Sequence, residues 1–341
     1  MTTCVSRARC ALVALGAFGV LAIAPAAASA ATVQAELRVL TPTRVLDPGT
    51  TYLVGAESVT TDPGADCNFG GAGGTGSTFE LPEPNGLGLL AAGAEADPNL
   101  RPLSVSDEFG FGVAICAIGG VDDQPGTFWY LKRNHQELTV GADQEPIAGG
   151  DEFLVYLAPD NFPEPNPDEL ELIAPARTTP GEPFSVSVIE HGCATDPNTF
   201  EVTCQSGPAA GATVGGGGVE ATTGADGTAQ LTAAASGRLK LTATRGTDIP
   251  SQALRMCVKE DIDLCPKRHG ERIVGSADGE RIKGTKGPDV IRGRGGDDRI
   301  DVRGGEVDKV DCGPGEDKVL VRRGDEDADR LAGDCERPRR G

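Results

Sequence analysis

The chain has 341 residues and a formal net charge of −20 at pH 7, and its aromatic content of 4% is low, whereas glycine and proline are plentiful. A protein this acidic is not drawn to nucleic acid or to anionic lipid by long-range attraction, so neither is expected as a partner. The composition favours many short strands joined by turns over bundles of helices.

Residues 1–30 have the pattern of an export signal. Arg7 and Arg9 form a basic start, residues 11–24 are apolar and uncharged, and small residues precede Ala31. The apolar run is short for a bilayer span, so a cleaved signal peptide is favoured over a membrane anchor. No later run is long enough to cross a membrane, and we expect a secreted or cell-surface protein.

The cysteine count indicates disulfides. Of the ten cysteines, two lie in the signal segment, and an even number of the others in an exported chain favours pairing. A zinc site is the other interpretation, but the chain has no C-x-x-C pair and only three histidines. Sequential pairing is the simplest, although sequence alone does not prove it. The predicted pairs are Cys67–Cys116, Cys193–Cys204, Cys257–Cys265 and Cys312–Cys335.

Composition divides the rest of the chain into three predicted domains. Residues 32–165 are acidic and hold the only tryptophan and all three tyrosines, and a proline-rich connector leaves this part at 159–168. Residues 169–258 are rich in Ala, Thr, Gly and Val, and residues 270–336 carry nine-residue repeats. We expect a mainly β, multi-domain protein.

The sequence of the first domain predicts several strands and one short helix. Alternation from Val33 to Val39 indicates a half-buried strand, and Asn85–Ala94 is the best helix candidate. Further strands are expected where Phe109, Phe111, Val113 and Ile115 alternate, at 126–135, which ends in a polar turn, and at 153–157.

Three motifs of this region resemble the transcobalamin-like C-terminal domain family. They are the strand of Trp129 with Asn134 at its turn, the closing strand GGDEFLVYL from Gly149, and the NGLGLL segment from Asn85. The resemblance implies a small β-grasp-like α+β domain, which in transcobalamins helps to cover a corrinoid. Trp129 and Tyr130 are therefore a possible ligand platform, or else they pack in the core of the sheet. The large helical partner domain of those carriers is not found in this sequence, so ligand binding does not follow from the resemblance.

The second domain shows strand-like runs at short intervals, separated by turn signals. Pro208–Val214 and Thr223–Thr232 resemble bacterial immunoglobulin-like repeat domains. Thr223–Thr232 looks like the hairpin of that family, with the tight-turn signal Asp226-Gly227. The resemblance implies an immunoglobulin-like β-sandwich that serves as a spacer or in adhesion. The predicted strands are Leu170–Ile173, Phe184–Val188, Phe200–Cys204, Thr228–Ala233, Leu239–Ala243 and Leu254–Val258.

An acid followed two residues later by an aliphatic recurs at spacings of nine or ten in the third domain. A helix would scatter this pattern around its surface, whereas a coil that turns a corner every nine residues would keep it in register. The aliphatics would point inward and the acids would lie in glycine-rich corners. The acids are Glu271, Glu280, Asp289, Asp298, Asp308 and Asp317, and the aliphatics are Ile273, Ile282, Ile291, Ile300, Val310 and Val319.

Corners that alternate between two edges bring acids 18 or 19 residues apart together. One edge is expected to hold Glu280, Asp298 and Asp317, and the other Glu271, Asp289 and Asp308. Stacked carboxylates repel unless a cation lies between them, and Ca²⁺ accepts such oxygen ligands in flexible geometry.

The pattern is similar to hemolysin-type (RTX) calcium-binding repeats, which implies a short parallel β-roll with calcium as the cofactor. Two central copies match best, with Gly284, Gly287 and Asp289 in one, and Gly293, Gly296 and Asp298 in the next. The expected metal residues are these six together with Asp308 and Asp317. The glutamates of the first two copies are expected to lie in degenerate capping turns.

Basic side chains are frequent between these acids, at positions such as Lys286, Arg292 and Arg299. They could neutralise the carboxylates without any metal, so a metal-free, salt-bridged β-coil is the alternative interpretation.

No pattern of an enzyme is found. The sequence has no H-E-x-x-H, nucleophile elbow or P-loop, and His135, His191 and His269 lie far apart, with His135 expected in an exposed turn. We expect an exported, non-enzymatic modular protein with calcium-binding repeats, which acts in binding or adhesion outside the cytoplasm. The alternative is a protein that binds a small, corrinoid-like ligand through the first domain.

Overall fold

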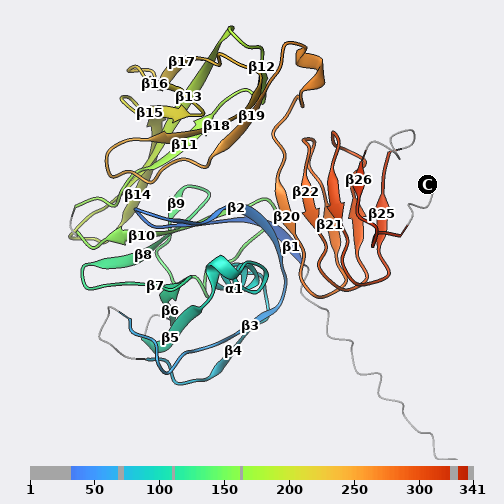
Figure 1. The fold of residues 1–341 in the computed structure, drawn as a ribbon. Helices are drawn as coiled ribbons and strands as arrows, with labels where there is room; N and C mark the ends of the chain where they lie inside the picture. The colour runs from blue at the N-terminus through green and yellow to red at the C-terminus, as the bar shows by residue number, and fades with distance from the viewer. Residues whose placement is uncertain (1–31, 68–72, 110–111, 162–163, 323–328, 337–341) are drawn as a thin grey trace, which may run out of the picture.

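A computed structural model of the protein describes residues 32–67, 73–109, 112–161, 164–322 and 329–336. The expected signal peptide lies outside the described residues. The chain is mainly β, as predicted, and its strands form several sheets (Figure 1). Among the described residues, no helix has both the length and the apolar character needed to cross a membrane.

The largest sheet begins with the first strand of the described chain. Strand β1 (Val33–Leu40) pairs antiparallel with β2 (Val45–Val54) on one side and parallel with β10 (Glu152–Pro159) on the other. Strand β8 (Thr127–Arg133) follows β10, and β9 (Gln136–Glu137) closes that edge through a tight turn. Inward side chains such as Leu37, Val39 and Val155 are fully buried in the core of this unit.

Helix α1 (Gly86–Ala96) packs on this sheet, where the sequence predicts the helix. Asn85 caps its start, because the Asn85 Oδ1 accepts a hydrogen bond from the Gly88 backbone N–H at 2.8 Å. Leu87, Leu89 and Leu90 are fully buried, which offsets the weak helix propensity of its glycines.

Two small sheets and a short helix complete the first unit. The alternation from Phe109 to Ile115 does not form one strand, because β5 ends at Phe109 and β6 begins at Gly112, which has a left-handed φ of 121°. The Cys67–Cys116 disulfide joins β6 to the loop between β3 and β4. The elements are β3 (Glu57–Thr60), β4 (Thr78–Leu81), η1 (Pro98–Leu100), β5 (Leu103–Phe109), β6 (Gly112–Ile118) and β7 (Val121–Asp122).

The second unit consists of two sheets around one apolar core. In the first sheet, the long strand β13 pairs with β11 on one side and with β14 and β17 on the other; the second sheet has the order β12-β19-β18-β15-β16. The strands are β11 (Glu169–Ile173), β12 (Arg177–Thr178), β13 (Pro183–Thr195), β14 (Val202–Pro208), β15 (Thr213–Gly216), β16 (Val219–Thr222), β17 (Thr228–Thr232), β18 (Gly237–Thr244) and β19 (Leu254–Val258).

Two local expectations in this unit need correction. Phe200 lies outside the strand predicted for it, with a φ of 59° and an exposed side chain, and β14 begins at Val202. Asp226-Gly227 does form a tight turn, but it does not close a hairpin, because β16 and β17 on its two sides belong to different sheets.

The repeats form a parallel β-roll of strands of two or three residues, which Figure 1 shows in orange and red. Successive strands alternate between two sheets, as the nine-residue spacing predicts. A short helix, η2 (Ile262–Leu264), and the Cys257–Cys265 disulfide precede the roll. One sheet has β20 (Arg272–Val274), β22 (Val290–Arg292), β24 (Lys309–Asp311) and β26 (Arg330–Leu331), and the other has β21 (Arg281–Lys283), β23 (Arg299–Asp301) and β25 (Lys318–Leu320).

The roll does not stand apart from the first unit, because one of its sheets continues the largest sheet of the molecule. Strand β20 pairs parallel with β2, with Ile273 opposite Thr51. At the second roll sheet, the Gln34 side chain takes the place of a neighbouring strand. Its Nε2 donates to the Lys283 carbonyl at 3.0 Å and its Oε1 accepts from the Lys283 N–H at 2.9 Å. The first unit therefore covers the N-terminal end of the roll.

Candidate calcium-binding edges of the roll

The aliphatic of each repeat points into the roll. Within one sheet, Ile273, Ile291 and Val310 lie opposite one another, and in the other sheet Ile282, Ile300 and Val319 do so. All six side chains are essentially inaccessible to solvent. No single coil could bury them, so stacking of neighbours drives the roll to form.

The acid two residues before each aliphatic lies in a corner, and the corners form the two predicted edges. The Glu280 N–H donates to Asp298 Oδ1, and the Asp298 N–H donates to Asp317 Oδ1, both at 2.9 Å. On the opposite edge, the Glu271 N–H donates to Asp289 Oδ1 and the Asp289 N–H to Asp308 Oδ1, both at 2.8 Å. One carboxylate oxygen of each aspartate is thus used to join its coil to the preceding one.

The second edge is longer than the sequence predicts. The Asp308 N–H donates to Asp329 Oδ1 at 3.0 Å, and Leu331 stacks beyond Val310 in strand β26. Asp329 and Leu331 carry the same acid–x–aliphatic pattern as the other repeats. Their wider spacing of 21 residues from Asp308 breaks the nine-residue period, so the sequence pattern does not indicate them.

The other carboxylate oxygen is free in three of these aspartates. The Oδ2 atoms of Asp298, Asp308 and Asp317 are buried and accept no hydrogen bond from the described residues. Asp289 differs, because its Oδ2 accepts from the Thr285 N–H. A buried carboxylate oxygen without a donor is costly to desolvate, so these atoms need a cation or a proton.

Burial is also the main reason why the pKa values of two of these acids are raised. Burial, together with the nearby carboxylates of Glu280 and Asp317, raises the pKa of Asp298 to about 7. Burial and the carboxylates of Asp289 and Asp329 raise the pKa of Asp308 to about 7. Among the described residues, no positive charge is a main influence on either pKa.

The basic side chains of the roll do not neutralise the edges. Within the described part of the chain, no lysine or arginine nitrogen lies within 4.0 Å of a carboxylate oxygen of Asp289, Asp298, Asp308 or Asp317. Arg294 instead pairs with Glu95 of helix α1, and Arg303 pairs with Asp301. The alternative of a salt-bridged coil is thus not supported by the positions of these bases.

The corner glycines leave room between coils and beside the aspartate carboxylates. A Cβ added at Gly293 would lie 2.4 Å from Asp298 Oδ2 and 2.3 Å from the Cys312 carbonyl oxygen, and one at Gly284 would lie 2.9 Å from Asp289 Oδ2. A Cβ at Gly287 would lie 1.8 Å from the His269 carbonyl oxygen. Of the four predicted metal glycines, only Gly296 has a positive φ, of 85°. Close approach of the coils therefore accounts for most of these glycines, rather than left-handed backbone.

These observations fit calcium. Free, buried carboxylate oxygens beside spaces kept open by glycine are the hard oxygen donors that Ca²⁺ prefers, and loop carbonyls could supply the remaining ligands. Asp298 with Asp317 and Asp308 with Asp289 stay the predicted ligand pairs. A bound ion would supply the positive charge that the edges lack.

The two glutamates lie at the covered end of the roll. The Glu271 carboxylate accepts from Thr51 Oγ1 of β2 at 3.0 Å, and the Glu280 carboxylate accepts from the Ser276 N–H at 2.9 Å. Their longer side chains thus reach partners other than a shared corner. Toward the opposite end, the Cys312–Cys335 disulfide joins the corner between β24 and β25 to the C-terminal segment.

The other predicted residues lie away from the roll. Trp129 and Tyr130 are buried, with exposures of 6% and 2%, so neither ring offers an open face to a ligand. His135 lies in the turn before β9 but is not exposed as expected. Its ring stacks on that of His191, with centroids 3.8 Å apart, because the first two units contact each other there. The Cys193–Cys204 disulfide lies beside this contact.

Comparison with known proteins agrees with the repeat geometry. Residues 274–306 match the family described as RTX calcium-binding nonapeptide repeat (4 copies). The matched segment includes Asp289, Asp298 and the four predicted glycines, whereas Asp308 and Asp317 lie just beyond it. No curated protein matches the chain. The RTX resemblance and the calcium cofactor are thus confirmed for the repeat segment: the chain carries RTX calcium-binding repeats.

Proposed function

We propose that this chain is an exported, non-enzymatic modular protein that calcium stabilises, and that it acts in binding or adhesion at or outside the cell surface. The observation that carries the proposal is the set of free, buried Oδ2 atoms of Asp298, Asp308 and Asp317 along the roll edges. Extracellular modules bind calcium with dissociation constants of roughly 10⁻⁴–10⁻³ M, which suits the calcium level outside cells.

Three further features support export. The N-terminal segment has the pattern of a signal peptide, and the four disulfides require an oxidising compartment. The acidic charge suits a soluble surface module. In this proposal the first unit is a transcobalamin-like, β-grasp-like domain and the second is an immunoglobulin-like spacer, with predicted boundaries at 32–165 and 169–258.

The test combines stability with surface binding. Thermal unfolding of the full chain is followed in millimolar calcium and then in chelator, and binding to the surface of the native cells is measured in both conditions. Calcium is expected to stabilise the roll by about 1–3 kcal/mol for each occupied site, and binding is expected to fall in chelator. An unfolding transition that calcium does not move would contradict the proposal, as would surface binding that is absent in both conditions.

The corrinoid alternative has its own test. The burial of Trp129 and Tyr130 removes the platform that the sequence suggested for it. Incubation with cobalamin followed by gel filtration would give a visible absorption band in the protein peak if the first unit binds a corrinoid. We expect no such band.

A further inference from the structure

A polar cluster lies where the first unit contacts the second, far from the roll in sequence. The carboxylate of Glu169 is buried at the centre of this contact, within 3.2 Å of both Arg38 Nη1 and Lys132 Nζ. The Lys132 ammonium also donates to the His191 carbonyl at 2.8 Å. Two histidine rings, from different units, stack beside this cluster with an interplanar angle of 5°.

The backbone of His135 is unusual for its residue type. Asn134 and His135 have φ values of 50° and 67°, which is the left-handed hairpin turn that normally takes glycine at its second position. The Asn134 side chain fixes the turn to the start of β10. Its Nδ2 donates to Asp151 Oδ1 at 2.8 Å and its Oδ1 accepts from the Glu152 N–H at 2.9 Å. A histidine in a position that favours glycine suggests that its side chain has a use.

The Nδ1 atoms of both rings have partners inside the protein. His135 Nδ1 lies 3.1 Å from Glu169 Oε2, and His191 Nδ1 lies 2.7 Å from Ser206 Oγ. Such contacts orient the rings of metal-binding histidines and leave Nε2 as the ligand atom. Arg38 and Lys132 fix the Glu169 carboxylate, and this carboxylate in turn orients the His135 ring.

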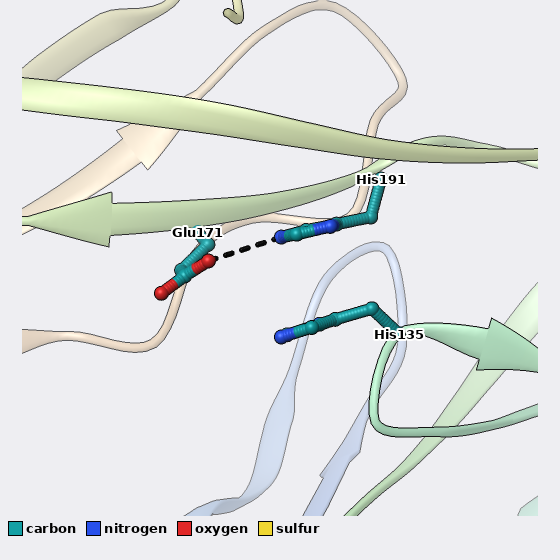
Figure 2. A group of neighbouring side chains, drawn as sticks. All are labelled: His135, Glu171 and His191. Carbon is teal, nitrogen blue, oxygen red and sulfur yellow. Dashed lines mark hydrogen bonds and ion pairs between the residues drawn. The ribbon is translucent and has the colours of Figure 1, made fainter. Parts of the chain in front are cut away.

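The His191 Nε2 points at the Glu171 carboxylate, and a ring nitrogen of His135 lies close to both. One nitrogen or oxygen from each of His135, His191 and Glu171 lies within 4.8 Å of the others, and Figure 2 shows the nitrogen ends of both rings on the side of Glu171. His191 Nε2 is 3.1 Å from Glu171 Oε2, and Glu152 Oε2 is 3.7 Å from His135 Nε2. The Glu171 side chain is 41% exposed, which leaves a path for an ion from solvent.

We propose that His135, His191 and Glu171 form a transition-metal site, of the Zn²⁺ class, that joins the first unit to the second. Two imidazoles and one carboxylate are a donor set for Zn²⁺ and its neighbours, whereas calcium takes oxygen ligands. The ion would replace the proton shared between His191 Nε2 and Glu171, and Glu152 or water would complete the shell. Binding would tilt the two rings out of their parallel stack, since both Nε2 lone pairs must then point at one atom.

The test uses the full chain with calcium held at saturation, so that the roll edges do not compete for the added ion. Zn²⁺ is titrated by calorimetry, Co²⁺ serves as a spectroscopic probe, and histidine ¹⁵N signals are recorded by NMR. One equivalent of Zn²⁺ is expected, with shifts at the Nε2 atoms of His135 and His191. His135→Gln and Glu171→Gln should each weaken Zn²⁺ binding at least about tenfold, and Ser206→Ala about tenfold through ring orientation.

His269→Gln is the matched control, because His269 is the third histidine and lies outside the cluster, where its ring contacts the Arg255 and Ala174 carbonyls. This variant should bind Zn²⁺ as the unchanged protein does. Glu171→Gln keeps the test valid if a histidine variant folds poorly. The Glu171 side chain is the most exposed of the three proposed ligands, so this change is expected to disturb folding least. Equal Zn²⁺ affinity in the unchanged protein, His135→Gln and Glu171→Gln would overturn the proposal, as would unmoved Nε2 signals.

Discussion

At the scale of single residues, the two carboxylate oxygens of a roll aspartate have different roles. Oδ1 of Asp298 accepts a backbone N–H from the preceding coil, whereas its Oδ2 is buried and accepts none. The first oxygen sets the register of the coils. The second oxygen destabilises the folded protein until a proton or a cation binds it, because its burial without a partner costs free energy.

Asp298→Asn should therefore have opposite effects with and without calcium. The amide oxygen can still accept the Glu280 N–H, but the buried negative charge is gone. We expect calcium affinity to fall by about tenfold or more, because the charge count of the ligands tunes the affinity of such sites. In chelator, the same variant should unfold at a higher temperature than the unchanged protein.

Asp311→Asn is the matched control, because Asp311 loses the same charge from an exposed position in β24. Calorimetry and thermal unfolding of both variants check the prediction. Equal calcium affinity in the two variants would show that Asp298 is not a ligand.

The raised pKa values predict how the roll responds to pH without calcium. The pKa values of Asp298 and Asp308 are about 7 in the folded chain and near the ordinary 3.8 when the chain is unfolded. The folded state thus binds these protons more tightly, so their contribution is fully present below about pH 4 and is lost as the pH rises through 7. In chelator, stability should therefore fall between about pH 4 and pH 7 and level off above that.

Urea unfolding in chelator across this range, compared with the double variant Asp298→Asn/Asp308→Asn, isolates the contribution of the two acids. The double variant should show a flatter dependence on pH. Calcium should remove most of the decline in the unchanged protein, because the ion replaces the protons. Parallel pH profiles for the two proteins in chelator would rule out this account.

At the scale of elements, the roll depends on coils that approach closely at their corners. Strands β21 to β25 have three residues each, and only the middle side chain of each is buried. The core of the roll is thus narrow, and beside the repeat aliphatics it holds Val302 and Cys312. Any group that separates two coils at a corner also separates the aliphatics that stack beside it.

Gly293→Ala tests this closeness. The added Cβ would lie 2.3 Å from the Cys312 carbonyl and 2.4 Å from Asp298 Oδ2, so two coils must move apart. We expect a loss of about 1–3 kcal/mol in stability, as for other overpacked sites, together with weaker calcium binding. Gly333→Ala is the control, since an added Cβ there meets nothing within 4 Å. Equal unfolding temperatures for the two variants would refute the expectation.

At the scale of the whole molecule, one sheet runs from the first unit into the roll. Strand β20 pairs with β2, and the Glu271 carboxylate accepts from Thr51 of β2. Leu53 of β2 belongs to the apolar core of the roll. The end of the first unit is thus the template on which the first coil forms.

Calcium should therefore affect the first unit as well as the roll. Removal of calcium is expected to speed hydrogen exchange in β20 and β22 strongly, and in β2 to a smaller degree, because β2 loses an ordered neighbour. Strands β17 and β18 of the second unit are the internal control. Exchange measured by mass spectrometry checks this, and unchanged protection of β2 on chelation would mean that the two parts are not coupled.

The sequence by itself determined the repeat coil and the chemistry of its edges. The nine-residue spacing of acid and aliphatic is a local signal, because each repeat builds the same corner and strand wherever it occurs. The two edges, the inward aliphatics and the match to RTX repeats at 274–306 all follow from that period. The helix at Asn85 was also visible locally, because its cap and its leucines lie within a few residues.

Tertiary structure alone decided which distant segments meet. The pairing of β2 with β20 joins residues more than two hundred positions apart. The stacking of His135 on His191 joins two units, and the sequence motifs of each unit give no sign of the other. Such contacts depend on which surfaces remain unpaired once each unit has folded. A periodic pattern records the environment of a residue within its own element, and it carries no information about the element that will cover it.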